Sequence, residues 1–311
     1  MTMGDRQMTD HNENGETRCG VVAIVGAPNA GKSTLTNALV GQKVAIVSPK
    51  VQTTRTRLMG IAITGDAQLL LIDTPGIFSP RRRLDRAMVA AAWEGATDAD
   101  VIVLVVDAKG RVNEQVEAIV DSLAQRPGAK FLVLNKVDIA SKEALLVLTA
   151  NLNQRLAFDH VFMISAASGD GVEDLKQALA EKMPAGPWHF PEDQVSDVTT
   201  RLLSAEITRE QLFLQLHDEL PYDSTVEVEK WEERRDGSVA IHQQILIARE
   251  SQRAIVLGKG GSRIKSIGAA ARAELCEQLD RKVHLFLHVK VKADWAEDRD
   301  VYRDMGLDWV D

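Results

Sequence analysis

Three short segments of the chain carry residue types at spacings that suit the binding of a nucleoside triphosphate. The first reads Gly26-Ala-Pro-Asn-Ala-Gly31-Lys32-Ser33 and follows the pattern G-x-x-x-x-G-K-S. Its glycines let backbone N–H groups turn toward phosphates, Lys32 can reach the β- and γ-phosphates, and the Ser33 hydroxyl can ligate Mg²⁺. We expect nucleotide contacts from Gly26, Asn29, Ala30, Gly31, Lys32, Ser33 and Thr34.

The other two segments each follow a predicted buried strand. Asp73-Thr-Pro-Gly76 comes after Leu69–Ile72, so it can place a carboxylate beside the metal and a flexible glycine at the γ-phosphate. Asn135-Lys136-Val-Asp138 comes after Phe131–Leu134. A carboxylate there can accept both the N1–H and the exocyclic amine of guanine, which adenine does not offer in that arrangement. The three segments together predict a site for GTP and GDP with Mg²⁺.

These segments need elements that bring them to one edge of a sheet. Up to about residue 183, strand-like apolar runs alternate with helix-like amphipathic stretches. The expected strands are Val21–Val25, Leu58–Ile63, Leu69–Ile72, Val101–Val106, Phe131–Leu134 and Val161–Ile164. The expected helices are Lys32–Val40, Leu84–Trp93, Val112–Ala124, Lys142–Leu156 and Val172–Lys182. This alternation predicts a doubly wound α/β domain with a mostly parallel sheet over residues 19–184, which binds its ligand at the carboxyl ends of the strands.

A proline-rich stretch then separates a second, smaller unit. We expect a linker over 185–198, because Pro184, Pro187 and Pro191 interrupt the pattern. The expected order over 199–295 is helix, two strands, a short helix, a second helix and a last strand. The expected bounds are Thr199–Leu216, Thr225–Glu232, Val239–Leu246, Ser262–Leu279 for the second helix, and Val283–Val291. An acidic tail follows over 296–311, and the polar residues 1–18 are expected to form a disordered leader.

Charge is distributed unevenly along the chain. The net charge of −8 would by itself argue against a nucleic-acid partner, but residues 249–292 hold ten Lys or Arg against four Asp or Glu, a local net charge of +6. Because salt screens a field within about 8–10 Å, local charge decides what a face binds. Inside this basic stretch, Gly258-Lys259-Gly260-Gly261 opens a helix, with Ile255, Val256, Ile264 and Ile267 at spacings that suit packing on a sheet. A G-x-x-G loop of this kind can approach a nucleic-acid backbone closely.

Composition narrows the setting. The apolar run Val101–Val106 has the length of a buried strand, and no apolar run approaches the roughly 20 residues that cross a bilayer. The two cysteines, Cys19 and Cys276, lie far apart in the chain, so a reducing, cytoplasmic compartment is the default expectation.

With these motifs in this order, the chain resembles the Era-type P-loop GTPases, in which a GTPase domain precedes a type II KH domain. The match covers roughly Cys19 to Trp295. The resemblance implies that Ser165 and Ala166 form a further guanine-binding element, and that a switch I threonine ligates Mg²⁺ together with Ser33 and Asp73. Thr54 is our first choice for that threonine and Thr53 is the alternative. The expected catalytic set is Lys32, Thr54, Asp73 and Gly76.

One residue departs from the pattern of Ras-like GTPases. Ile77 follows Gly76 at the position where Ras-like proteins carry a glutamine that orients water, and its side chain cannot form that hydrogen bond. The intrinsic hydrolysis rate is therefore expected to be slow. In related GTPases with such a replacement, an asparagine in the phosphate loop can hold K⁺. Asn29 occupies that position, and the competing interpretation is that Asn29 merely caps the turn.

The resemblance also implies a partner and a role. The KH domain would bind the 3′ end of 16S rRNA through Gly258, Lys259, Gly260, Gly261, Arg263 and Lys265, and the protein would act on the 30S subunit during small-subunit assembly. It would be a cytoplasmic monomer with peripheral association at the inner membrane. Two alternatives are a signalling-type GTPase whose C-terminal domain binds a protein, and a GTP-dependent enzyme that modifies RNA. No second catalytic set supports the latter.

Overall fold

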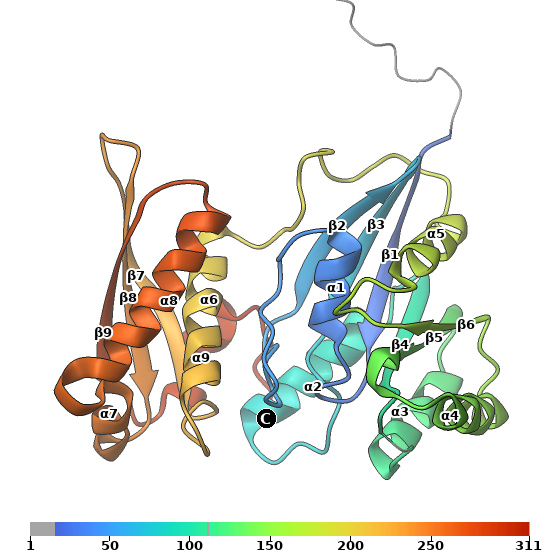
Figure 1. The fold of residues 1–311 in the computed structure, drawn as a ribbon, viewed down its shortest axis with the longest axis horizontal. Coiled ribbons are helices and arrows are strands. Elements are labelled where there is room, and N and C mark those ends of the chain that lie inside the picture. Colours follow the sequence, from blue (N-terminus) through green and yellow to red (C-terminus); the bar gives the residue numbers. More distant parts are fainter. Residues whose placement is uncertain (1–15, 111, 311) are drawn as a thin grey trace, which may run out of the picture.

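Two β-sheets organise the chain (Figure 1). The structure is a computed structural model that describes residues 16–110 and 112–310. The larger sheet has the order β2-β3-β1-β4-β5-β6, and all neighbours are parallel except β2 and β3. Its strands are β1 Arg18–Val25, β2 Leu58–Thr64, β3 Ala67–Asp73, β4 Val101–Asp107, β5 Ala129–Asn135 and β6 His160–Ile164. The predicted doubly wound, mostly parallel α/β fold is confirmed.

Helices cover both faces of this sheet. They are α1 Lys32–Val40, α2 Arg83–Gly95, α3 Glu114–Ala124, α4 Lys142–Arg155 and α5 Val172–Lys182. Because side chains alternate along a strand, Val22 and Ile24 of β1 pack against α1 and α5, whereas Ala23 and Val25 pack against the opposite layer with α3 and α4. Burial on both faces explains why the strands read as continuous apolar runs in the sequence.

The start of β1 corrects the prediction for the leader. Arg18 is the first residue of β1 and pairs with Ala67, and the Thr17 hydroxyl donates a hydrogen bond to Gly186 O at 2.9 Å. The expectation that these two residues belong to a disordered leader is therefore wrong. Backbone pairing with β3 extends the strand past its apolar core, whatever the side chains are. Residues 1–15 of the predicted leader lie outside the described residues.

The segment over 185–198 runs along the outer edge of the larger sheet. Ile61 N donates to Val195 O at 2.8 Å, and Gly60 and Ser196 form an antiparallel bridge. Trp188 and Phe190 pack against a small cluster that includes Ile61. The predicted linker therefore covers the outer edge of β2, which is the edge strand of the sheet on this side.

The second unit has the predicted order of elements. It contains α6 Thr200–Gln215, β7 Ser224–Glu233, β8 Val239–Ile247, α7 Glu250–Leu257, α8 Ser262–Gln278 and β9 Val283–Val291. Its sheet has the order β7-β8-β9, in which β8 and β9 are parallel. Leu212 of α6 and Ile267 of α8 are fully buried against Ile245 of β8, so the helices lie on one face of this sheet. The small α+β domain is confirmed.

The C-terminal tail lies between the two units. The 3₁₀ turn η3 Trp295–Glu297 leads into α9 Arg299–Asp304. Trp295 and Tyr302 are buried in one cluster with Met88 of α2 and Leu246 of β8, and Figure 1 marks the C-terminal end beside α2. The tail thus bridges the larger domain and the smaller one. No helix among the residues in 16–110 and 112–310 is long and apolar enough to cross a membrane.

Candidate functional site

The glycine-rich loop between β1 and α1 is held tightly by its neighbours. A Cβ on Gly26, where φ is 153°, would lie 2.3 Å from Val105 O, and a Cβ on Gly31, where φ is 97°, would lie 2.2 Å from Asn135 Nδ2. Both positions therefore require glycine, because no side chain fits the space and few adopt the backbone angle. Asn29 also has a positive φ of 62° and is exposed at the turn of the loop.

Lys32 lies beneath this loop rather than in solvent. It is 6% exposed, and its Nζ donates to Ala27 O at 3.1 Å and to Gly26 O at 3.3 Å. Burial lowers the pKa of Lys32 to about 8, and the nearby Asp73 carboxylate opposes that shift. The ammonium group is thus held at the loop where the phosphates are expected.

The predicted metal ligands come together at the carboxyl end of β3. Ser33 Oγ lies 2.7 Å from both Thr54 Oγ1 and Asp73 Oδ2, and Thr54 Oγ1 lies 3.4 Å from the same Asp73 oxygen. Thr53 is turned away from them, because its hydroxyl is bonded to Ser48 and to Lys50 O. The geometry brings Thr54, and not Thr53, to the other two side chains.

Asp73 shows that this cluster suits a cation. The residue is fully buried, and its Oδ1 has no hydrogen-bond partner among the described residues. Burial raises the pKa of Asp73 to about 6, although Lys32, Ser33 and Thr54 all favour the charged form. A buried carboxylate oxygen without a partner is costly unless a cation pairs with it, and hard oxygen ligands of this kind suit Mg²⁺. The residues present therefore fit a magnesium ion.

Gly76 and Ile77 close the site from the side of the third strand. A Cβ on Gly76 would lie 2.9 Å from Pro28 Cα, so the loop after β3 packs directly on the phosphate loop. Ile77 N donates to Gly26 O at 3.1 Å, while the Ile77 side chain is 7% exposed and packs in the core with Val25. The side chain at the position where Ras-like GTPases carry a glutamine therefore points into the core.

A cavity of about 490 Å³ lies over these residues. Ser33, Thr54 and Gly76 line it, and the loop over 46–54 forms its outer wall. This volume lies within the usual range for small-molecule sites of about 300–1,000 Å³.

Asn135 connects the phosphate loop to the predicted base-binding loops. Its Nδ2 donates to Ala30 O and its Oδ1 accepts from Ala166 N, both at 2.9 Å. Lys136 Nζ donates to Asn29 O at 2.7 Å and pairs with Asp107 at 2.6 Å. One buried amide thus fixes two loops relative to each other.

The remaining base-site residues lie on the same side of the sheet. Asp138 is exposed on the 3₁₀ turn η1 Val137–Ile139 after β5. Ser165 is buried after β6, and Ser168 N donates to its hydroxyl at 3.4 Å. The structure places these two loops beside each other at the carboxyl ends of neighbouring strands.

The second glycine loop joins α7 to α8. Gly258, Gly260 and Gly261 have φ values of 71°, 60° and 76°, and a Cβ on Gly258 would lie 2.7 Å from Arg263 Cβ. The loop therefore needs glycine for its backbone. Lys259 and Lys265 are exposed beside it.

Two side chains near this loop differ from expectation. Arg263 is only partly exposed, because its Nη1 donates to Gln215 O at 2.6 Å and so connects α8 to the end of α6. The prediction that Ile255 packs on the sheet is wrong, since this side chain is 54% exposed. Helix α7 has only eight residues, and Val256 alone of them is buried.

Three buried charged residues hold the loop over 43–55. Arg55 is 1% exposed and donates to Ser224 O at 2.8 Å and to Tyr222 O at 3.0 Å. Arg209 and Glu210 of α6 are buried against the same loop. Arg55 ends the segment Gln52 to Arg55 that resembles switch I, whereas Arg209 and Glu210 belong to no motif and are brought to the nucleotide site by the fold.

Comparison with known families gives matches to both domains. Residues 21–136 match the family described as 50S ribosome-binding GTPase, and residues 219–296 match the KH domain family. GTPase Era of Erythrobacter litoralis is 61% identical over 298 residues, which is 94% of this chain and 98% of that protein. GTPase Era of Brucella suis is 56% identical over 309 residues, 99% of each chain.

Solved structures show the same two-domain architecture. An Era protein in complex with MgGDPNP and nucleotides 1506–1542 of 16S ribosomal RNA superposes with a TM-score of 0.87 at 36% identity, over 93% of this chain and 99% of that chain. A single-residue variant of Aquifex aeolicus Era bound to GDP·AlF₄⁻ gives the same values.

Proposed function

The chain belongs to the Era family of GTPases, and we propose that it is a GTP-hydrolysing switch that binds the 3′ end of 16S rRNA during assembly of the 30S subunit. One observation carries the proposal: the chain matches, over 93% of its length, an Era protein solved with both MgGDPNP and 16S rRNA nucleotides. The match includes the KH domain, which argues against a signalling GTPase with a protein-binding C-terminal domain.

The phosphate side of the site is assigned to three segments of this chain. The backbone of Gly26 to Thr34 would surround the phosphates, and Lys32 would supply the positive charge. Ser33, Thr54 and Asp73 would hold Mg²⁺, which when bound neutralises charge on the β- and γ-phosphate oxygens. Gly76 packs on the phosphate loop and would offer its N–H to the γ-phosphate. Support for this assignment comes from the clustered hydroxyls and from Asp73 Oδ1, which has no hydrogen-bond partner in the part of the chain that the structure describes.

The base side is assigned to the loops that Asn135 joins. Asp138 would accept hydrogen bonds from guanine, while Asn135, Lys136, Ser165 and Ala166 would shape the pocket around it. The double hydrogen bond of Asn135 supports this arrangement, because the base loops and the phosphate loop then move as one body. Guanine is preferred because adenine would leave the Asp138 carboxylate without a hydrogen-bond donor.

Hydrolysis needs a group other than Ile77, whose side chain is in the core. We assign that part to K⁺ held by Asn29, whose exposed position at the phosphate loop suits an added cation. The GTPase rate should then be higher in K⁺ than in Na⁺, and Asn29→Ala should remove the difference while the rate in Na⁺ stays unchanged. Equal rates in the two buffers would show that Asn29 only shapes the turn.

RNA binding is assigned to the loop Gly258 to Gly261 with Lys259, Arg263 and Lys265. The test is the affinity for a single-stranded oligonucleotide of the 16S rRNA 3′ end against one of scrambled sequence. Gly260→Asp should weaken binding about tenfold, because it adds a negative charge where the RNA phosphates approach. The added Cβ itself meets nothing within 4 Å.

The loop between β7 and β8 offers a matched control. Gly237 also has a positive φ, 79°, and open space around its Cβ position. Gly237→Asp introduces the same charge and the same backbone strain in the same domain, and it should leave RNA affinity unchanged. Equal binding of the two oligonucleotides by the unaltered protein would overturn the RNA assignment, whatever its GTPase rate.

Location and assembly state rest on the resemblance alone. We propose a cytoplasmic monomer that associates peripherally with the inner membrane. Fractionation of cells with and without high salt would test this, since a peripheral protein is released by salt and an integral one is not.

A further inference from the structure

The loop that forms the outer wall of the nucleotide cavity is held by the smaller domain. We name residues 43–55, between α1 and β2, the switch segment. Lys50 Nζ donates to Phe213 O and Leu216 O, so it caps the carboxyl end of α6. Val47 N donates to Glu210 Oε1 of α6 at 2.7 Å. The described contacts of this segment with the smaller domain are concentrated on α6 and the turn that follows it.

The contacts on either side of Thr54 are the most direct. Thr53 O accepts a hydrogen bond from Arg209 Nη2. Arg55 donates to Pro221 O, Tyr222 O and Ser224 O, at 3.2, 3.0 and 2.8 Å. The residues before and after Thr54 are thus both bound to the smaller domain, while the Thr54 hydroxyl faces Ser33 and Asp73.

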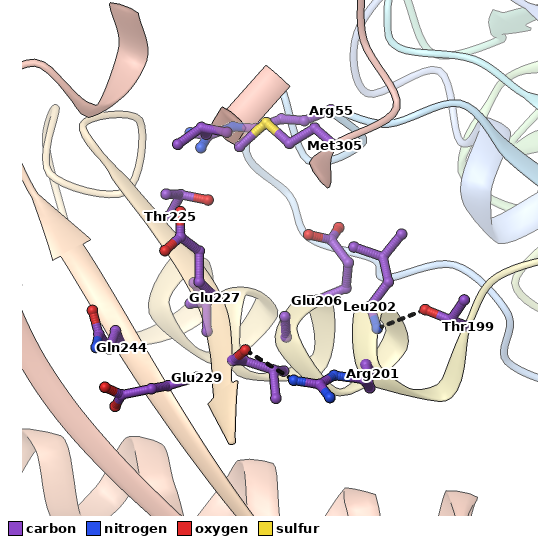
Figure 2. Close-up of a pocket in the computed structure, with 14 residues that line it drawn as sticks. Arg55, Thr199, Arg201, Leu202, Glu206, Thr225, Glu227, Glu229, Gln244 and Met305 are labelled. Carbon is purple, nitrogen blue, oxygen red and sulfur yellow. Dashed lines mark hydrogen bonds between the residues drawn. The ribbon is translucent and has the colours of Figure 1, made fainter. Parts of the chain in front are cut away.

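Figure 2 shows the position of Arg55 in this interface. The side chain extends from the larger domain to the rim of a cavity of about 440 Å³, whose other walls come from α6, β7, Gln244 of β8 and the tail residue Met305. Its guanidinium carbon lies 5.6 Å from the ring centres of both Phe213 and Trp295. Arg55 therefore attaches the end of the switch segment to the smaller domain and its tail.

Neighbouring residues of α6 hold the Arg209 side chain in place for its hydrogen bond to Thr53 O. Its Nε donates to Glu206 Oε1 at 2.7 Å, the two side chains form an ion pair one turn apart, and Phe213 lies 5.1 Å from its guanidinium carbon. The side chain is 1% exposed. A guanidinium fixed on both sides loses little further freedom when it binds Thr53 O.

Glu210 holds the opposite end of the switch segment. Besides Val47 N, it binds Lys43 Nζ at 2.6 Å, and Lys43 also contacts Glu274 of α8. Helix α8 begins directly after the glycine loop assigned to RNA. The helix that carries the RNA loop and the helix that carries Arg209 thus meet at one lysine of the switch segment.

We propose that Arg209 and Glu210 are positioning residues of the GTPase reaction: by binding Thr53 O and Val47 N, they hold the switch segment so that Thr54 reaches the metal site. This proposal rests on the function proposed above. Neither side chain lines the nucleotide cavity, so both act through Thr54. Because Thr54 is expected to matter only when a γ-phosphate is present, their effect should be specific for GTP over GDP.

The test is the affinity of the full chain for GDP and for a non-hydrolysable GTP analogue, measured in four proteins: unaltered, Arg209→Gln, Thr54→Ala and the double variant. Arg209→Gln should lower the affinity for the analogue about tenfold, the usual worth of one hydrogen bond to a charged group, and change that for GDP less than about twofold. In the Thr54→Ala background, Arg209→Gln should have no further effect, because the residue through which it acts is gone.

Arg201→Gln is the matched control. It makes the same substitution on the same helix, at an exposed arginine that donates to Val228 O within its own domain. It should leave both affinities unchanged. Hydrogen exchange of the peptide 43–57 in the nucleotide-free protein gives a readout independent of the ligand, and Arg209→Gln should speed it where Arg201→Gln does not.

The outcomes separate this proposal from the one on which it rests. If Thr54→Ala lowers both affinities alike, the assignment of Thr54 fails. Suppose that Thr54→Ala lowers only the affinity for the analogue. Arg209 is then merely structural if Arg209→Gln lowers both affinities alike, or if it has its full effect in the double variant as well. If Arg209→Gln disturbs the smaller domain, seen as a loss of RNA affinity, Lys43→Met tests the same point from the larger domain. It should lower analogue affinity several-fold, and no change would overturn the proposal.

Discussion

Replacing Asn135 tests whether the phosphate and base loops form one rigid body. Asn135 is 2% exposed, and it satisfies Ala30 O and Ala166 N with two buried hydrogen bonds of 2.9 Å. Asn135→Ala leaves both backbone groups buried without a partner, at a cost of about 1–3 kcal/mol each. The two groups are coupled through one side chain, so we expect a total loss in free energy of unfolding of about 3 kcal/mol.

A second variant separates the hydrogen bonds from the volume of the side chain. Asn135→Asp keeps the shape and still accepts from Ala166 N, but it sets an oxygen against Ala30 O in place of the donor. It should destabilise the domain at least as much as Asn135→Ala does. Two domains need not unfold together, so the assay is hydrogen exchange of the slowest amides of β1, β4 and β5, which reports on the larger domain.

The expected exchange is about a hundredfold faster than in the unaltered protein, which corresponds to about 3 kcal/mol. The affinities for GDP and GTP should fall equally, since both nucleotides use both loops. The control is Asn151→Ala, at an exposed position on α4. Exchange in Asn135→Ala within about threefold of the control would refute the reasoning, because the two bonds would then contribute less than about 1 kcal/mol.

Three further predictions concern single sites. Asp138→Asn should lower GTP affinity at least about a hundredfold and raise affinity for xanthosine triphosphate, because an amide donates where guanine needs an acceptor; competition between the two nucleotides measures this. Gly76→Ala sets a Cβ 2.9 Å from Pro28 Cα and should cost about 1–3 kcal/mol of GTP-analogue binding by titration, whereas an unchanged affinity would show that the loop after β3 yields freely. Trp295→Ala removes a side chain that is 2% exposed and donates to Asp223 O at 3.0 Å, so thermal unfolding should show a loss of about 3–5 kcal/mol, and a loss below about 1 kcal/mol would mean that the tail packs loosely.

Helices and strands were predictable where burial produces a regular pattern of apolar residues in the sequence. Strands β1 and β4 are buried on both faces and read as continuous apolar runs, so their existence was clear. Their ends were less so. Strand β1 starts at Arg18 and not at Val21, because the ladder with β3 uses backbone groups that carry no sequence signal.

The nucleotide site was predictable because its parts are local. Gly26 lies against the Val105 carbonyl and Gly31 against the Asn135 amide, both with a positive φ, so glycine is needed at both positions and their spacing identifies them. Ile255 was misassigned for the opposite reason. Ile255 and Val256 are adjacent, so they lie on different sides of a helix, and α7 is too short for the pattern to show which side faces the sheet.

The anchoring of the switch segment was not predictable, because most of its contacts use a main-chain group on one side, which carries no sequence signal. Arg55 stands in a polar run and has the features of a solvated loop residue, yet it is fully buried. Burying a guanidinium is costly unless its donors are met, and the carbonyls of 221, 222 and 224 accept from the two terminal nitrogens of Arg55 only while that turn lies against the switch segment. If the smaller domain turned away, Arg55 would have to leave its site. The same burial that hides Arg55 from sequence analysis therefore makes the position of Thr54 depend on the position of the KH domain.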